Sequence, residues 1–107
     1  MNWLQVCAEH LLPHEDGIAV LVGDRHVAVF RTAFDEVLAV GNIDPFSGIG
    51  VISKGIVGDR RGEPTVSSPL HKQVFSLHSG RCLDEPEVAL PTYPARLHHG
   101  AVEVGSD

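Results

Sequence analysis

Hydrophobic residues in this chain occur in short runs that glycine and proline separate. These runs are rich in Val, Ile and Phe and cover residues 3–6, 18–22, 26–31, 37–40, 65–67, 73–77, 93–97 and 101–104. Short β-branched runs that are interrupted by turn residues about every ten positions predict an all-β domain. In the last pair of runs, Tyr93, Ala95 and Leu97 alternate and are predicted to share one face. Val102 and Val104 would oppose them on the returning strand.

Polar segments between these runs are predicted to form turns. Residues 23–25 and 32–36 are predicted hairpin turns. Residues 98–100 are predicted to form another, since Gly can supply the positive φ that such turns need. Residues 7–12 have a helical composition, but Pro13 would end a helix after about a turn and a half. We therefore expect a short turn there between the first two strands. No repeat or linker divides the chain, which predicts one domain spanning residues 1–107.

Composition excludes several classes of protein. The 107 residues hold 8 Lys and Arg against 14 Asp and Glu, a formal net charge of −6, and basic residues adjoin only at Arg60-Arg61. Such a chain is a poor partner for nucleic acid or for an anionic membrane surface. The longest apolar run has about five residues, far below the ~20 of a membrane span, and no basic leader precedes it, which predicts a soluble cytoplasmic protein. Cys7 and Cys82 lack C-x-x-C spacing and are expected to be free thiols.

No catalytic motif is present in the sequence. Gly48-Ile49-Gly50 lacks the G-K-[ST] ending of a phosphate-binding loop. His10 and His14 have the spacing of zinc ligands on a helix, but Pro13 between them breaks that geometry. The adjacent acids at 35–36 fall in a predicted turn, where we expect them to be solvated. The chain is thus predicted to have no catalytic apparatus of its own.

Two segments are more distinctive. N-I-D-P-F occupies positions 42–46 and S-P-L-H-K-Q occupies 68–73, with Phe75 and Gly80 following. Together they resemble the Rieske domain, whose two loops read C-P-H and C-P-x-H-G and are followed by a similarly placed Phe and Gly. The resemblance implies an antiparallel Rieske-like sandwich of short stacked sheets. It also implies two loops that would hold a [2Fe–2S] cluster, each through one Cys and one His.

The four ligand positions of that resemblance fall on Asp44, Phe46, Ser68 and His71. Only His71 is a ligand of the family's type. Phe46 cannot bind iron, and Asp44 and Ser68 offer hard oxygens where cluster iron prefers thiolate. Lys72 replaces the usual Gly after the second His. We therefore expect the fold to be retained and the cluster to be lost, with no cofactor and no metal in this chain.

The pairing of N-I-D-P-F with S-P-L-x-K-Q indicates one particular family of Rieske-like domains. It is similar to the small subunits of NAD(P)H-dependent assimilatory nitrite reductases, in many of which Lys stands at the position of His71. Further agreement is found at Trp3 and at residues 6–7, 27–31, 52–55 and 93–96. This resemblance implies a non-catalytic subunit that docks on a large subunit. The large subunit would hold FAD, a [4Fe–4S] cluster and sirohaem and reduce nitrite to ammonium in nitrate assimilation.

The resemblance also suggests where the partner binds. We expect the former cluster loops to form the contact, with Phe46, Leu70 and Lys72 as its centre. In the alternative interpretation, Phe46 fills the space left by the cluster and Asp44 caps the loop backbone. Three other functions remain open: a Rieske-type electron-transfer ferredoxin, a mononuclear metal site at Asp44 and His71, and a stand-alone binding module.

Overall fold

The central sheet of the structure is apolar on both of its faces. A computed structural model describes residues 2–70 and 72–106 of the chain. The central sheet has the strand order β2-β3-β4-β8, with β2 at Asp16–Val22, β3 at Arg25–Arg31, β4 at Val37–Gly41 and β8 at Thr92–Tyr93. Successive side chains of a strand point to opposite faces. In β3, Val27 and Val29 therefore face one hydrophobic core, whereas Ala28 and Phe30 face the other.

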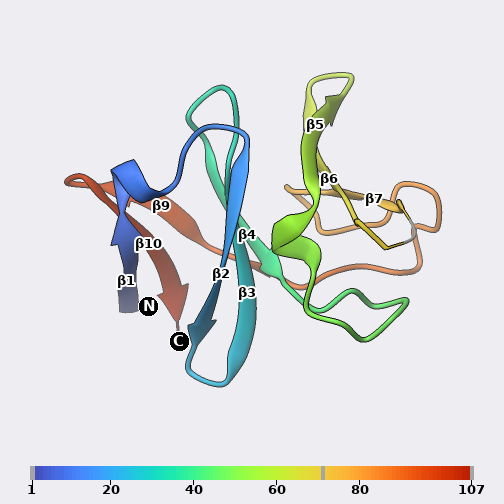
Figure 1. Cartoon of the computed structure of the whole chain (residues 1–107), viewed down its shortest axis with the longest axis horizontal. Coiled ribbons are helices and arrows are strands. Elements are labelled where there is room, and N and C mark those ends of the chain that lie inside the picture. Colours follow the sequence, from blue (N-terminus) through green and yellow to red (C-terminus); the bar gives the residue numbers. More distant parts are fainter. Residues whose placement is uncertain (1, 71, 107) are drawn as a thin grey trace.

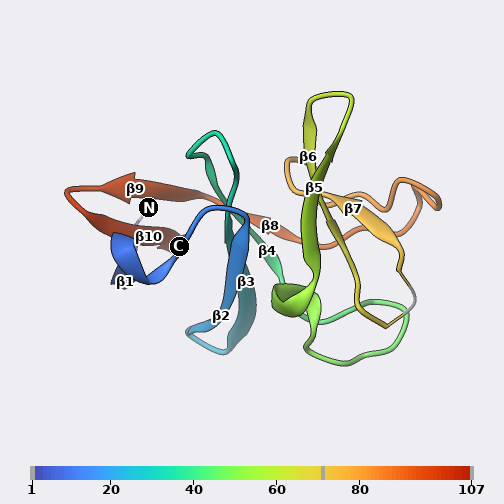
Figure 2. The same cartoon turned by 45° about the horizontal axis from the view of Figure 1, so that its top comes forward.

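Two three-stranded sheets cover these faces. The first has the order β1-β10-β9 and the second β5-β6-β7, and every pairing is antiparallel. Their strands are β1 (Asn2–Ala8), β10 (Ala101–Ser106), β9 (Ala95–His98), β5 (Ile56–Arg60), β6 (Glu63–Ser67) and β7 (Val74–Ser76). Figures 1 and 2 show the three sheets side by side, with both chain ends at the β1-β10-β9 sheet. The all-β sandwich predicted from the sequence is confirmed.

Each interface between sheets holds its own core. The core between the central sheet and the β1-β10-β9 sheet consists of buried aliphatic residues: Leu12, Val22, Val27, Val29, Val37, Ala39, Val102 and Val104. The second core also contains the two buried phenylalanines and consists of Ala28, Phe30, Val40, Ile52, Val66, Phe75, Leu77, Cys82 and Leu90. This second core supports the loops described in the next section.

The turns agree with the sequence prediction. Residues 32–36 connect β3 to β4, and Gly23 and Gly100 have positive φ angles in the turns before β3 and β10. A one-turn 3-10 helix, η1 (Glu9–Leu11), lies between the first two strands, where a short turn is predicted. A second such helix, η2 (Ile52–Lys54), follows β4.

The strands differ from the sequence prediction in two places. Residues 93–97 are not one strand: Tyr93 pairs with Ala39 in the central sheet, whereas Ala95 pairs with Val104 in the outer one. Pro94, which has no N–H to donate, separates the two pieces. The sequence also gives no indication of β5, because this edge strand pairs only with β6 and is largely exposed. An edge strand in this position needs no continuous apolar pattern.

Candidate functional site

Two loops meet beside the second core. The first comprises residues 42–51 after β4, and the second comprises residues 68–73 between β6 and β7. The first loop is fixed at its base, where Asn42 Oδ1 accepts the N–H of Ser53 at 2.7 Å. It then closes on itself, since the N–H groups of Asp44 and Gly48 donate to the carbonyls of Ile49 and Asp44 at 2.8 and 2.7 Å. The loop therefore has a defined shape set by its own backbone.

A buried carboxylate joins the two loops. The Ser68 hydroxyl donates to Asp44 Oδ2 at 2.5 Å, and the Phe46 N–H donates to Asp44 Oδ1 at 2.8 Å. Asp44 is fully buried and Ser68 is 1% exposed. Both positions correspond to cysteine ligands in the Rieske resemblance. A hydrogen bond across 24 residues of sequence thus connects the loops where a cluster would otherwise do so.

Phe46 lies partly in the protein interior. Its ring is half-buried against the second core and lies 6.3 Å from the ring of Phe75, centroid to centroid, at an interplanar angle of 45°. Tilted aromatic pairs at this distance contribute favourable packing. This geometry agrees with a space-filling role and leaves part of the ring accessible.

The second loop is closed by backbone hydrogen bonds and contains a residue with a positive φ angle. The Ser68 N–H donates to the Gln73 carbonyl at 2.9 Å, and the Lys72 N–H donates to the Ser68 carbonyl at 3.0 Å. Lys72 has a φ of +59°, in the left-handed region that favours glycine. The Rieske resemblance places Gly at this position, which is Lys72 in this chain. His71 lies outside the described residues.

Apolar side chains are exposed at this end of the molecule. Leu70 is 42% exposed and Lys72 is also exposed. Ile43 and Ile49, 40% and 52% exposed, are further apolar residues of the first loop that the sequence prediction missed. Their exposure could have been predicted from the sequence, because both isoleucines lie in loop segments with nearby Gly or Pro, where no strand would bury them. We call Ile43, Phe46, Ile49, Leu70 and Lys72 the loop-end surface.

The described ligand positions do not fit a [2Fe–2S] cluster. Both oxygens of Asp44 already accept hydrogen bonds, Ser68 donates its proton to one of them, and Phe46 has no ligand atom. Neither free cysteine replaces the missing thiolates, because Cys7 packs in the first core and Cys82 in the second. Burial also raises the pKa of the Cys7 thiol, which disfavours the thiolate that iron requires. Within residues 2–70 and 72–106, no group of three or more His, Cys, Asp or Glu side chains could hold a metal ion.

Among the remaining sequence candidates, His14 and the adjacent acids at 35–36 have structural partners. His14 Nε2 lies 2.7 Å from Asp35 Oδ1, and Arg31 Nε donates to the same oxygen at 2.8 Å. Hydrogen bonds from Arg31 and then from His14 lower the pKa of Asp35. Glu36 lies 3.0 Å from His78 Nε2 rather than forming a carboxylate pair with Asp35. Across the described part of the chain, no helix has the length and apolarity to cross a membrane.

Comparison with known proteins agrees with this architecture. The model of the Rieske-like [2Fe-2S] domain family matches residues 2–105. The small subunit of Escherichia coli K12 nitrite reductase (NADH) is 39% identical over 105 residues, which are 96% of each chain. The chain belongs to the nitrite reductase small-subunit family. A Mycobacterium tuberculosis crystal structure, assigned as an NADH-dependent nitrite reductase small subunit, superposes with a TM-score of 0.92 at 48% identity, covering 96% of this chain and 93% of that one.

One relative is much longer than this chain. The Klebsiella oxytoca nitrite reductase [NAD(P)H] large subunit contains a segment that is 39% identical over 104 residues. The match covers 97% of this chain but 11% of the Klebsiella protein. In that organism, a domain of this family is therefore continuous with the large subunit.

Proposed function

We propose that this chain is the small subunit of an NAD(P)H-dependent nitrite reductase and that it acts by binding the large subunit. The observation that carries the proposal is the Klebsiella large subunit, in which a segment similar to nearly all of this chain forms part of one polypeptide. Domains that are covalently joined in one organism and separate in another commonly work in the same complex. Small subunits of similar length, such as that of E. coli, support the separate form.

Electron transfer belongs to the large subunit in this proposal. The described loop residues offer no thiolate and no imidazole for a cluster, and Asp44 and Ser68 bind each other instead. FAD, a [4Fe–4S] cluster and sirohaem in the large subunit would carry electrons from NAD(P)H to nitrite and yield ammonium. Because NAD(P)H is a cytoplasmic reductant, the complex would act in the cytoplasm. This chain would position or stabilise its partner without catalytic residues of its own.

The loop-end surface is the contact that we propose for the large subunit. Leu70, Ile43 and Ile49 supply exposed apolar area, Lys72 supplies a positive charge, and the half-buried Phe46 holds the base of the surface against Phe75. Apolar anchors on well-fixed loops are typical of interfaces, since little conformational freedom is lost on binding. The hydrogen bonds of both loops provide that fixation.

Co-purification tests the function directly. The tagged chain is isolated from its own cells grown on nitrate, and the absorbance spectrum of the eluate is recorded. The expected result is a large protein that co-elutes with flavin and sirohaem bands and reduces nitrite with NAD(P)H. A chain that elutes alone and colourless would refute stable membership in this complex. Iron–sulfur absorbance on the isolated chain would instead support the electron-transfer ferredoxin.

A matched pair of variants tests the contact surface. Leu70→Asp places a charge on the loop-end surface, and Leu4→Asp places the same charge on β1, at a residue of nearly equal exposure (42% and 43%). We expect Leu70→Asp to weaken binding of the large subunit by about 30-fold or more, as the loss of an interface anchor does. Leu4→Asp should leave it unchanged. Equal binding by both variants would refute the loop-end surface as the contact.

A further inference from the structure

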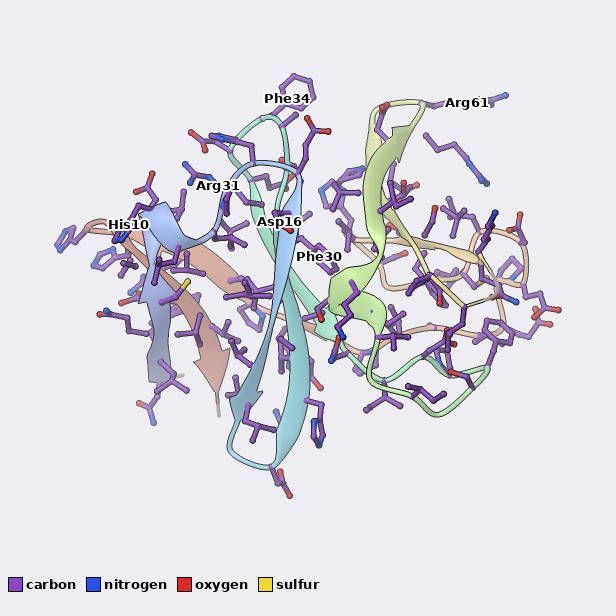
Figure 3. The ribbon with its side chains drawn as sticks, viewed as in Figure 1. His10, Asp16, Phe30, Arg31, Phe34 and Arg61 are labelled. Atoms are coloured by element: carbon purple, nitrogen blue, oxygen red, sulfur yellow. The ribbon has the colours of Figure 1, made fainter. Side chains whose placement is uncertain are left out.

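The most exposed large hydrophobic side chain in the described part of the chain is far from the loop-end surface. Phe34 is 92% exposed and belongs to the turn 32–36 between β3 and β4. Figure 3 shows its ring projecting from the top of that turn, with Arg61 at the tip of the neighbouring β5–β6 hairpin. The loop of residues 42–51 begins at the other end of β4, about 17 Å away for five residues of strand. Phe34 therefore marks a separate surface.

The turn that carries Phe34 is held by several hydrogen bonds. The Thr32 N–H donates to the Glu36 carbonyl at 2.8 Å, and the Thr32 hydroxyl oxygen accepts the N–H groups of Phe34 and Glu36 at 3.3 and 3.2 Å. Asp35 has a φ of +69° and receives the Arg31 Nε hydrogen bond that fixes it in this conformation. The backbone thus fixes the point from which the Phe34 side chain projects before any partner binds. A preformed turn loses little backbone entropy when its side chain enters a pocket.

The cleft beside Phe34 has an acidic lining, and Arg61 lies outside that lining at the hairpin tip. A cleft of about 120 Å³ lies between the turn and the β5–β6 hairpin. It is lined by apolar atoms of Ala33, Phe34, Val57 and Pro64 and by three acidic residues, Glu15, Glu36 and Asp59, with no Lys or Arg in its lining. Two copies of this chain that met through Phe34 would bring the same carboxylates together, and like charges across an interface oppose association. The charge of the cleft lining therefore favours a partner with basic side chains over a second copy.

We propose that Phe34 anchors a second contact with the large subunit by entering an apolar pocket whose rim carries Lys or Arg side chains. This inference rests on the proposed function, because the large subunit is the partner that the function requires. The ring supplies the buried apolar area, and the carboxylates of Glu15, Glu36 and Asp59 pair with the basic rim. With contacts at both ends of β4, the small subunit can dock in only one orientation.

Affinity measurements with the full chain and the cofactor-loaded large subunit test the proposal. Phe34→Ala should raise the Kd by about 30-fold or more. The double substitution Glu15→Gln and Glu36→Gln should slow association and reduce its dependence on salt, since rim charges act mainly on the association rate. The matched controls are Leu4→Ala on β1 and Asp24→Asn in the turn at the opposite end of β3, and both should bind as the wild type does. Unchanged thermal unfolding of Phe34→Ala shows that the fold is intact.

The outcomes separate this inference from the proposed function. If the wild-type chain binds the large subunit and Phe34→Ala binds equally well, the Phe34 contact is refuted and the function stands. If the wild-type chain does not bind, the proposed function is refuted, and the contact with it. If the chain alone forms a dimer that Phe34→Ala abolishes, a second copy occupies this surface and the proposal is overturned.

Discussion

Replacing Ser68 with alanine should destabilise the protein, because the Ser68 hydroxyl is a partner of the buried Asp44 carboxylate. The donor and acceptor oxygens are 2.5 Å apart, and the two residues are 1% and 0% exposed. Without the hydroxyl, Asp44 Oδ2 would keep its burial and lose this hydrogen bond. A hydrogen bond to a charged group contributes about 1.5–3 kcal/mol. This is a large share of the roughly 5–15 kcal/mol that stabilises a domain of this size.

The loss is measurable by thermal or denaturant unfolding. A decrease of about 2 kcal/mol corresponds to a fall in Tm of about 8–16 °C for a chain of this length. Ser47→Ala is the matched control, since the Ser47 hydroxyl oxygen accepts its hydrogen bond from the Ile49 N–H in an exposed part of the first loop. The control should change the free energy of unfolding by about 0.5 kcal/mol or less.

A double-mutant cycle assigns the effect to the pair. Ser68→Ala, Asp44→Ala and the double variant should give a coupling energy of about 1 kcal/mol or more, because the two side chains share one hydrogen bond. Hydrogen exchange adds a local measurement: the Phe46 amide, which donates to Asp44 Oδ1, should exchange faster in Asp44→Ala. A coupling energy near zero, or a Ser68→Ala variant as stable as Ser47→Ala, would refute the link between the loops.

Three further predictions concern other parts of the molecule. The Arg31 hydrogen bond lowers the pKa of Asp35 in the folded state. The stabilisation from Asp35 is therefore present above its ordinary pKa and is lost as the pH falls through the folded-state pKa. In the Asp35→Asn variant, the free energy of unfolding should fall less steeply than in the wild type below about pH 4. Acid titration of unfolding, with Asp24→Asn as control, measures this, and identical slopes for wild type and Asp35→Asn would contradict it. Gly80→Ala should cost at least about 2 kcal/mol in denaturant unfolding, since Gly80 has a φ of +78° and an added Cβ would collide with the Leu90 carbonyl; a neutral result would contradict that geometry. Restoring the ligand types of the Rieske loops should let iron and sulfide bind with visible absorbance, whereas a colourless product after reconstitution would show that the loops no longer suit a cluster. The substitutions are Asp44→Cys, Phe46→His and Ser68→Cys.

The strands that alternate or lie in the centre could be predicted from the sequence. β3 and β4 are continuous apolar runs because both of their faces are buried, and the predicted opposition of Leu97 and Val102 is found as a β9–β10 pair. β5 could not be predicted, since an exposed edge strand has no pattern to reveal it. The split at Pro94 also depends on tertiary structure, because either side of the proline is compatible with a strand.

Only some residues of the candidate site could be predicted from the sequence. The resemblance located Asp44, Phe46 and Ser68 in the two loops, and the predicted contact residues remain a hypothesis for the binding experiments. The hydrogen bond between Asp44 and Ser68 was beyond prediction, since residues 24 positions apart become neighbours only once the loops fold together. The exposure of Phe34 was also unforeseen, because a turn residue followed by two acids has no sequence feature that distinguishes an anchor from a solvated loop.

The two loops show how a cofactor fold can persist with protein contacts in the cofactor's place. A cluster would tie the loops together through four ligand bonds, and its removal would leave polar loop backbone around an empty space. Here the Asp44–Ser68 hydrogen bond joins the loops, and the Phe46 ring packs towards Phe75 at the side of the second core. Lys72 has a positive φ angle at the position that is Gly in the resemblance, and a lysine is strained in that conformation. Hydrogen bonds and ring packing within this chain thus hold the two loops together, and loops held in this way suit the partner recognition that we propose for them.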